Sequence, residues 1–331
     1  MKTNLNSPLA ALAICLIGLT NITPQAFAAD PLATWQVRTP AKSVNSQYLQ
    51  GVTYGNGRFV SVGYLGTVLY SSDGAKWKAA PKVSSKDLYS VIYRNGLFVV
   101  AGQDRTVLTS VDGISWLVYP GSIVGTLYCA TYGDGKFLLG GTSQFVESED
   151  GLAWPARPQP ENQVFDGLAA GKGTFVATTH DGDSNKPSIL TSPDGFIWTP
   201  RNAGLGDYLL GITYGNGRFV AVGDSGAVTT SGDGVTWTPH RIKGGDTLFG
   251  VCYGNKTFVT VGWAGEIQSS KDGKKWAKRP GKTQEALYSV CYGRNTFVAV
   301  GRNGTIVQSG KLLSKQATKA NTVNSGRHPV E

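Results

Sequence analysis

The chain has 331 residues, of which 44 are glycine, 8 are tryptophan and 1 is methionine; charged residues make up 16%. Glycine is nearly twice as frequent as the average of about 7%, and the charged share is well below the usual ~25%. This bias favours strands and tight turns, and it argues against a helical bundle, a coiled coil or a large α/β enzyme. The net charge of +9 suits acidic partners, but no run of Lys and Arg indicates nucleic acid.

Residues 1–28 have the features of a signal peptide. Lys2 gives a basic start, Leu9 to Leu19 form an apolar run, and Ala26-Phe27-Ala28 offers small residues for cleavage. Eleven apolar residues are too few to span a hydrocarbon core of about 30 Å, so we expect no stable membrane insertion. The segment therefore predicts an exported protein, periplasmic or extracellular.

A repeat of about 40 residues fills the rest of the chain. The segment Gly51 to Val60 returns almost unchanged as Gly211 to Val220, and five related segments lie between and after them. Each leads into a second strand, a glycine-bounded turn, a third strand and the motif Ser-x-Asp-Gly-x-x-Trp. The motif ends at Trp77, Trp116, Trp154, Trp198, Trp237 and Trp276. Four short strands in every repeat are typical of a propeller blade.

The ends of the repeat region indicate how the ring closes. There are seven first strands but six Ser-x-Asp-Gly motifs, because the last repeat stops at Gly310 before any tryptophan. Trp35 precedes the first repeat as Trp276 precedes the last. We therefore predict an all-β, seven-bladed β-propeller over residues 30–310, closed by the N-terminal strand around Trp35, and a disordered basic tail over 311–331.

The Ser-x-Asp-Gly-x-x-Trp motif resembles the Asp-box, or BNR repeat, of the sialidase-like propellers. The phrase from Gly215 to Gly226, Gly-Asn-Gly-Arg-Phe-Val-Ala-Val-Gly-Asp-Ser-Gly, is also similar to repeats of the photosystem II stability and assembly factor propellers. The resemblance implies that the six motif aspartates are structural. It would require an Arg-Ile-Pro segment for sialidase activity, and the chain has none.

Hairpin topology predicts that the Asn-Gly turns and the Ser-x-Asp-Gly turns share one face of the disc. The opposite face, which we call the variable face, collects the turns between second and third strands and the loops between blades. Because its sequence varies between repeats, we expect binding there. Trp263, Arg302 and Tyr64 occupy such turns in adjacent blades and suit a sugar ring, an anionic glycan or a peptide, or else merely cover their own blades. Arg105 and Asp224 occupy two further turns of this kind.

The fourth repeat carries an insertion that begins at His180. Asp181, Asp183 and Asn185 resemble the start of a calcium loop, but Lys186 replaces the expected glycine, so a solvated loop is the favoured interpretation. His180 and His240 are both expected on the variable face. No paired acids or nucleophile can be identified by spacing, so we assign no catalytic residue, metal or cofactor.

Three cysteines remain after removal of the signal peptide: Cys129, Cys252 and Cys291. Cys252 and Cys291 have the same register in adjacent blades, so their side chains point in the same sense and do not suit a disulfide. We expect all three to be small buried residues.

The function that these patterns favour is a monomeric, non-enzymatic exported propeller that binds a protein partner or a glycan through its variable face. The alternative is a polysaccharide-active hydrolase or lyase that uses His180, His240, Arg302 or Tyr64. A fold does not by itself decide between them.

Overall fold

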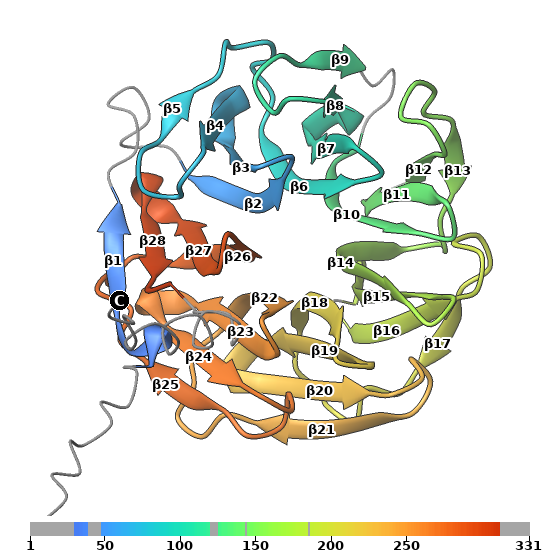
Figure 1. Cartoon of the computed structure of the whole chain (residues 1–331). Helices are drawn as coiled ribbons and strands as arrows, with labels where there is room; N and C mark the ends of the chain where they lie inside the picture. The colour runs from blue at the N-terminus through green and yellow to red at the C-terminus, as the bar shows by residue number, and fades with distance from the viewer. Residues whose placement is uncertain (1–29, 39–47, 120–124, 143, 185, 312–331) are drawn as a thin grey trace, which may run out of the picture. The chain divides into compact units, whose positions relative to one another are not determined.

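The computed structural model describes residues 30–38, 48–119, 125–142, 144–184 and 186–311. The predicted signal peptide and the predicted tail beyond residue 311 lie outside these residues. From Pro31 onward the described residues form one unit, a ring of seven four-stranded antiparallel sheets (Figure 1). The prediction of a seven-bladed β-propeller is confirmed.

Each blade is a meander that runs from the axis of the ring to its rim. Blade one comprises β2 (Leu49–Gly55), β3 (Arg58–Gly63), β4 (Thr67–Ser71) and β5 (Lys78–Ala79). The strands of blades two to four are β6 (Leu88–Arg94), β7 (Leu97–Gly102), β8 (Val107–Ser110), β9 (Leu117–Tyr119); β10 (Leu127–Gly133), β11 (Lys136–Gly141), β12 (Gln144–Ser148), β13 (Ala156–Pro158); β14 (Gln163–Gly171), β15 (Thr174–Asp181), β16 (Pro187–Ser192), β17 (Thr199–Arg201). The second strand of most blades is a nearly continuous apolar run, such as Leu97–Gly102, and it is buried because neighbouring blades cover both of its faces.

Blades five to seven repeat the pattern, and the outer strand of blade seven comes from the start of the chain. Their strands are β18 (Leu209–Gly215), β19 (Arg218–Gly223), β20 (Ala227–Ser231), β21 (Trp237–Arg241); β22 (Leu248–Gly254), β23 (Thr257–Gly262), β24 (Ile267–Ser270), β25 (Ala277–Arg279); β26 (Leu287–Gly293), β27 (Thr296–Gly301), β28 (Ile306–Ser309), β1 (Trp35–Arg38).

The described helices are 3-10 turns of three residues. They are η1 (Pro31–Ala33), η3 (Tyr64–Gly66), η4 (Gln103–Arg105), η5 (Asp224–Gly226), η6 (Trp263–Gly265) and η7 (Arg302–Gly304). All but η1 join the second strand of a blade to the third. Among the described residues, none of these helices is long or apolar enough to cross a membrane.

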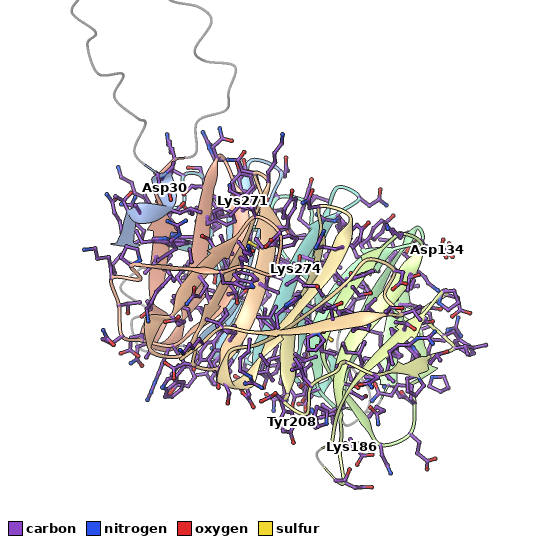
Figure 2. All side chains as sticks on the ribbon, turned by 90° about the horizontal axis from the view of Figure 1, so that it is seen from below. Asp30, Asp134, Lys186, Tyr208, Lys271 and Lys274 are labelled. Atoms are coloured by element: carbon purple, nitrogen blue, oxygen red, sulfur yellow. The ribbon has the colours of Figure 1, made fainter. Side chains whose placement is uncertain are left out.

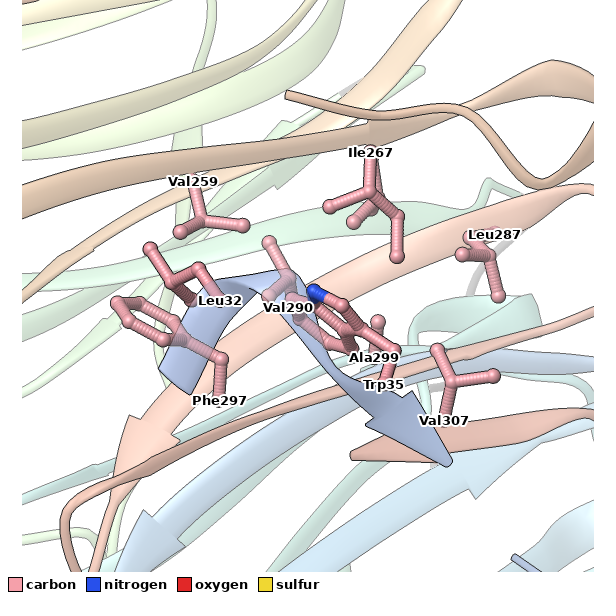
Figure 3. Packing of buried hydrophobic residues seen from close by; sticks show 10 residues of the cluster. Leu32, Trp35, Val259, Ile267, Leu287, Val290, Phe297, Ala299 and Val307 are labelled. Carbon is pink, nitrogen blue, oxygen red and sulfur yellow. The ribbon is translucent and has the colours of Figure 1, made fainter. Parts of the chain in front are cut away.

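Strand β1 closes the ring as the sequence predicts. It pairs antiparallel with β28, with Trp35 opposite Ser309 and Arg38 opposite Ile306. The Trp35 ring is 2% exposed and lies in a cluster with Leu32, Ile267 and Val307 (Figure 3). The chain therefore joins its first and last described strands in one sheet, so blade seven has four strands like the other six blades.

The hydrophobic core is divided among the contacts between blades. Seven clusters of buried residues each join two neighbouring blades, so each blade packs on the next around the whole ring. A phenylalanine at the start of the second strand, such as Phe59 or Phe219, is fully buried in these clusters. The ring of Phe59 lies 4.7 Å from that of Tyr54 and 6.4 Å from that of Trp77. Stability is therefore shared among seven similar interfaces.

The six Ser-x-Asp-Gly turns share the hydrogen bonds of their Ser and Asp side chains. Five of them also share the indole bond, because the Trp116 indole N–H has no partner among the described residues. In blade five the Asp233 carboxylate accepts bonds of 2.8 Å from the backbone N–H groups of Val235 and Thr236. The Ser231 hydroxyl accepts from the Gly234 N–H, and the Trp237 indole N–H donates to the Gly234 carbonyl. An Asp at a hairpin tip can satisfy backbone donors in this way. The motif aspartates thus hold their own turns, as expected for structural residues.

These turns predict an acid-sensitive fold. Backbone N–H donors lower the pKa of Asp233 and of Asp272 to about 2, and the other four turn aspartates also have a lowered pKa. An unfolded Asp titrates near 3.9, so the stability from these carboxylates is complete above about pH 4 and is lost as the pH falls toward 2. We expect the melting temperature to fall steeply over this range, measured by circular dichroism. A melting temperature that stays level from pH 4 to 2 would contradict this assignment.

The two faces of the disc differ as predicted. Hydrogen bonds link the turn between the first two strands of one blade to the Ser-x-Asp-Gly turn of the next, such as Asn56 Nδ2 to the Val111 carbonyl and Arg218 Nη1 to the Asp272 carbonyl. We call this side the Ser-Asp-Gly face. Figure 2 shows Asp134, Lys271 and Lys274 on it, and Tyr208 and Lys186 on the opposite, variable face.

Candidate functional site

The inner strand of every blade contains a β-bulge near its first residue. In blade one Leu49 pairs with Gly63 and Gly51 with Val62, so the residue between them has no partner in the register. The same shift recurs in the other six blades, and the seven residues that it frees are Gln50, Tyr89, Tyr128, Asp166, Leu210, Phe249 and Tyr288. We call these the bulge residues. A bulge redirects a side chain away from the regular pleat.

All seven bulge residues line one cavity on the axis of the ring. The cavity has a volume of about 190 Å³ and opens on the variable face. Most of its lining residues are aromatic, aliphatic or small, but the surface that they expose to the cavity is mainly polar. Asp166 is the only lining residue with a charged side chain among those described. The sequence creates this cavity because a small residue, such as Gly51 or Ser90, follows each bulge and lets neighbouring blades approach closely. We call its opening the channel mouth.

Six aromatic rings continue around the channel mouth from blade six to blade three. Successive centroids lie 5.3 Å apart for Phe249 and Tyr288, 6.3 Å for Tyr288 and Tyr48, and 5.2 Å for Tyr48 and Tyr64. Tyr64 lies 6.1 Å from Tyr89, and Tyr89 lies 5.1 Å from Tyr128. The angles between these rings, from 53° to 79°, are those of favourable tilted and edge-to-face pairs. We call this series the aromatic arc.

Three phenols of the arc, those of Tyr64, Tyr89 and Tyr288, have a raised pKa and stay neutral under ordinary conditions. Burial, with Asp87 as the next cause, raises the pKa of Tyr89 to about 12. Burial also raises the pKa of Tyr64 and of Tyr288. A neutral phenol can donate one hydrogen bond and accept others, so the arc offers apolar ring edges together with hydroxyl donors.

Of the three residues expected to form a cluster, Tyr64 and Arg302 both contact a second tyrosine, Tyr48. The Arg302 guanidinium lies 5.9 Å from the Tyr48 ring centroid, and Tyr64 contacts the same ring. Arg302 also lies 4.0 Å from the Glu285 carboxylate. Trp263 is 49% exposed in η6, and none of the ring pairs found among the described residues includes it. The structure therefore brings Tyr64 and Arg302 together through the Tyr48 ring and leaves Trp263 apart from them.

The fourth blade places an acid, Asp166, in the wall of the cavity and a histidine, His180, in contact with it. His180 Nδ1 lies 2.8 Å from Asp166 Oδ2, and the His180 ring meets Tyr208 edge-on at 5.5 Å. Burial raises the pKa of the Asp166 carboxyl, and the hydrogen bond from His180 opposes this shift. The placement of His180 on the variable face is confirmed, and its acidic partner is a residue that spacing did not identify.

Three other predicted residues lie in different surroundings. His240 lies on β21 opposite Val228, with its Nε2 3.3 Å from Thr230 Oγ1, and burial and then the charge of Lys274 lower its pKa. Arg105 is buried, because it takes the place of a turn glycine such as Gly66, with a φ of 55°. Asp224 accepts a hydrogen bond of 3.0 Å from Thr247 Oγ1 and so braces a loop between blades.

Tyr48 and the bulge residues were not predicted, because the candidate residues were sought in the turns and not in the inner strands. One pattern in the sequence does indicate the bulge residues. The residue after the buried Leu or Phe of each repeat varies in chemistry, while its neighbours on both sides are nearly constant. Within a strand, such a position faces neither the core nor a paired neighbour, which is what a bulge produces.

The insertion of blade four binds its own backbone. The Asp181 carboxylate accepts bonds from the N–H groups of Asp183 and Ser184 and from the Ser184 hydroxyl. Asn162 Nδ2 donates to Asp183 Oδ2 at 2.8 Å. Asn185 lies outside the described residues, and within them no group of three His, Cys, Asp or Glu residues could hold a metal ion.

The cysteines of the described chain are free thiols. Cys129 and Cys291 are buried, and Cys252 is partly buried. Burial raises the pKa of all three, so the neutral thiol is favoured. Cys129 Sγ lies 3.4 Å from the Gly140 carbonyl and 3.5 Å from that of Phe165. These contacts agree with the predicted packing role and the absence of a disulfide between them.

Comparison with known proteins adds structural neighbours. No protein-family model and no curated protein sequence matches the chain. Among solved structures, YCF48 bound to a D1 peptide is 18% identical, with a TM-score of 0.67 over 84% of this chain and 97% of that one. YCF48 from Cyanidioschyzon merolae is 16% identical, with a TM-score of 0.64 over 84% of this chain and 99% of that one.

An enzyme is also among these neighbours. An inactive variant of virginiamycin B lyase from Staphylococcus aureus, solved with quinupristin, is 11% identical, with a TM-score of 0.73 over 84% of this chain and 99% of that one. Because the neighbours include binding proteins and a lyase at such low identity, the likeness shows the fold alone. The chain is a seven-bladed β-propeller that shares its fold with these proteins.

Proposed function

We propose that this chain is an exported, non-enzymatic propeller that binds a segment of a partner protein at the channel mouth of its variable face. The observation that carries the proposal is the aromatic arc, which lines one side of a cavity on the axis. Tyrosine is enriched where proteins bind one another, because it buries a large rigid area and keeps a polar hydroxyl. Nothing in the repeat requires these residues, since the bulge position also accepts Gln50 and Leu210.

The shape of the mouth favours a peptide over a glycan. A sugar stacks on an open aromatic face, but the rings of the arc cover one another and present mainly edges and hydroxyls. The cavity of about 190 Å³ is smaller than the ~300–1,000 Å³ of typical small-molecule pockets. It suits one inserted side chain, with the flanking peptide laid over the arc.

The structural neighbours support the same class of partner. One of them was solved with a peptide, and another is the WD40 propeller domain of Doa1. A propeller presents a rigid face built from many loops, so the propeller itself loses little conformational freedom when a flexible segment binds to it. The predicted signal peptide supports export, and it places the partner in the periplasm or outside the cell.

Affinity capture from the envelope fraction tests this proposal. We expect the immobilised mature chain to retain a protein partner, and we expect the Tyr64→Ala/Tyr89→Ala variant to lose it. Leu117→Ser is the matched control, because Leu117 is 63% exposed on β9 at the rim. Retention of a glycan and of no protein, or equal retention by the tyrosine variant, would contradict the proposal.

A second candidate function rests on the pair formed by His180 and Asp166. A histidine held by a buried carboxylate can act as a general base or acid, and the carboxylate that holds His180, Asp166, lines the cavity. The corresponding activity is that of a polysaccharide-active hydrolase or lyase. Turnover on a panel of polysaccharides that His180→Ala abolishes would establish this function and displace the first.

A further inference from the structure

The Ser-Asp-Gly face has exposed apolar side chains at the tips of four consecutive blades. They are Val111 in blade two, Leu152 in blade three, Phe196 and Ile197 in blade four, and Val235 in blade five, with exposures from 46% to 68%. We call these residues the apolar tips. The turn geometry uses the Ser, Asp, Gly and Trp of the motif and places no demand on the residues between them. Blades one and six fill the equivalent positions with Ser72, Lys76, Lys271, Lys274 and Lys275.

The other part of the same face is basic. Lys76, Lys256, Lys271, Lys274 and Lys275 are exposed in the turns of blades six and one, and none of them takes part in the salt bridges found among the described residues. Figure 2 shows Lys271 and Lys274 on this face. The turn aspartates offset part of this charge, because they stay ionised within the same turns, as Asp272 does while it accepts hydrogen bonds from the Lys274 and Lys275 N–H groups. The turn of blade six nevertheless carries three lysines against this one aspartate.

We propose that the Ser-Asp-Gly face docks on an anionic lipid bilayer, with the apolar tips inserted between headgroups and the lysines of blades six and one against the phosphates. Isolated apolar tips, each on its own polar turn, do not form the continuous dry centre of a protein interface. They match a soft, flat partner that each tip can enter independently. The lysines supply the charge complementarity, since basic residues near a membrane are attracted to anionic lipids.

This arrangement gives the two faces of the disc different binding partners, lipid for the Ser-Asp-Gly face and protein for the variable face. The apolar tips and the channel mouth lie on opposite faces of the disc, as the positions of Lys274 and Tyr208 illustrate in Figure 2. A chain held on a bilayer by its Ser-Asp-Gly face presents the aromatic arc away from the lipid. Blade three has acidic Glu149 in the same turn as Leu152, and blade four has two apolar tips, so we assign the strongest insertion to blade four.

Vesicle co-sedimentation of the mature chain tests the proposal. Vesicles of phosphatidylcholine mixed with phosphatidylglycerol should sediment the protein, and vesicles of phosphatidylcholine alone should do so far less. We expect Phe196→Ser/Ile197→Ser to weaken binding about tenfold or more, because two apolar side chains no longer leave water. We expect Lys271→Glu/Lys274→Glu/Lys275→Glu to weaken it by roughly fivefold or more per charge, and high salt to do the same.

Leu65→Ser is the matched control, because Leu65 is an exposed leucine in η3 on the variable face and is 54% exposed. It should leave vesicle binding unchanged, and Tyr64→Ala/Tyr89→Ala should also leave it unchanged. The proposal is overturned if the wild-type chain does not sediment with anionic vesicles, or if Leu65→Ser weakens binding as much as Phe196→Ser/Ile197→Ser. A third result would also overturn it: the wild-type chain does not bind vesicles but retains an envelope protein that Phe196→Ser/Ile197→Ser fails to retain. That result would make this face a protein interface.

Discussion

Replacing Trp35 by alanine lowers the free energy of unfolding by about 3–5 kcal/mol, the usual cost of truncating a buried aromatic side chain. The Trp35 ring is 2% exposed and contacts a cluster that combines residues of blades six and seven, including Val259 and Phe297 (Figure 3). The substitution leaves a cavity where the first strand joins the last. It therefore weakens the closure of the ring as well as one local contact.

Urea denaturation followed by far-ultraviolet circular dichroism, a signal of the backbone, measures this loss of unfolding free energy. Val37→Ala is the matched control, because Val37 lies on the same strand β1 but is 56% exposed, so its truncation should change the unfolding free energy little. Equal stabilities of the Trp35→Ala variant and the wild type would show that β1 does not hold the ring together. Equal losses for Trp35→Ala and Val37→Ala would contradict the burial argument.

Replacing Tyr89 by alanine weakens binding of the partner by about 2 kcal/mol or more, a loss of affinity of roughly 30-fold. Tyr89 is both a bulge residue and a member of the aromatic arc, and its ring contacts those of Tyr64 and Tyr128. Its loss interrupts the arc and widens the cavity at the same point. Because Tyr89 lies at the mouth and belongs to none of the buried clusters, the fold should remain intact.

Isothermal titration with the captured partner segment measures this loss. The conservative variant Tyr89→Phe keeps the ring and should retain most of the affinity, which separates the aromatic contribution from that of the hydroxyl. A Tyr89→Ala variant that binds like the wild type, with an unchanged melting temperature, would remove the arc from the binding surface.

The architecture could be predicted because it depends on local and repeated signals. Asn-Gly turns, the Ser-x-Asp-Gly motif and the spacing of Trp77, Trp116 and the later tryptophans each report on a hairpin. Closure was predictable from Trp35, since the missing outer strand of the last blade had an obvious counterpart at the start of the chain. Each of the seven repeats predicts the same four-stranded blade, so a wrong interpretation of one repeat does not change the predicted fold.

The site was predicted only in part, because it depends on positions that the repeat hides. Tyr64, Arg302 and His180 were found on the variable face, but Tyr48 lies before the first repeat begins, and Asp166 lies on an inner strand. Which way a bulged residue points follows from the register of a strand pair, and hydrophobic alternation does not reveal it.

The most direct test of the central claim is photocrosslinking from defined positions of the propeller. A photoreactive phenylalanine analogue is placed at the channel mouth in place of Tyr128 or Tyr288, or at the rim in place of Leu117, and the envelope proteins that become attached are identified by mass spectrometry. The binding function proposed here predicts one partner segment attached from both mouth positions and not from the rim. Attachment from the rim with none from the mouth would contradict it.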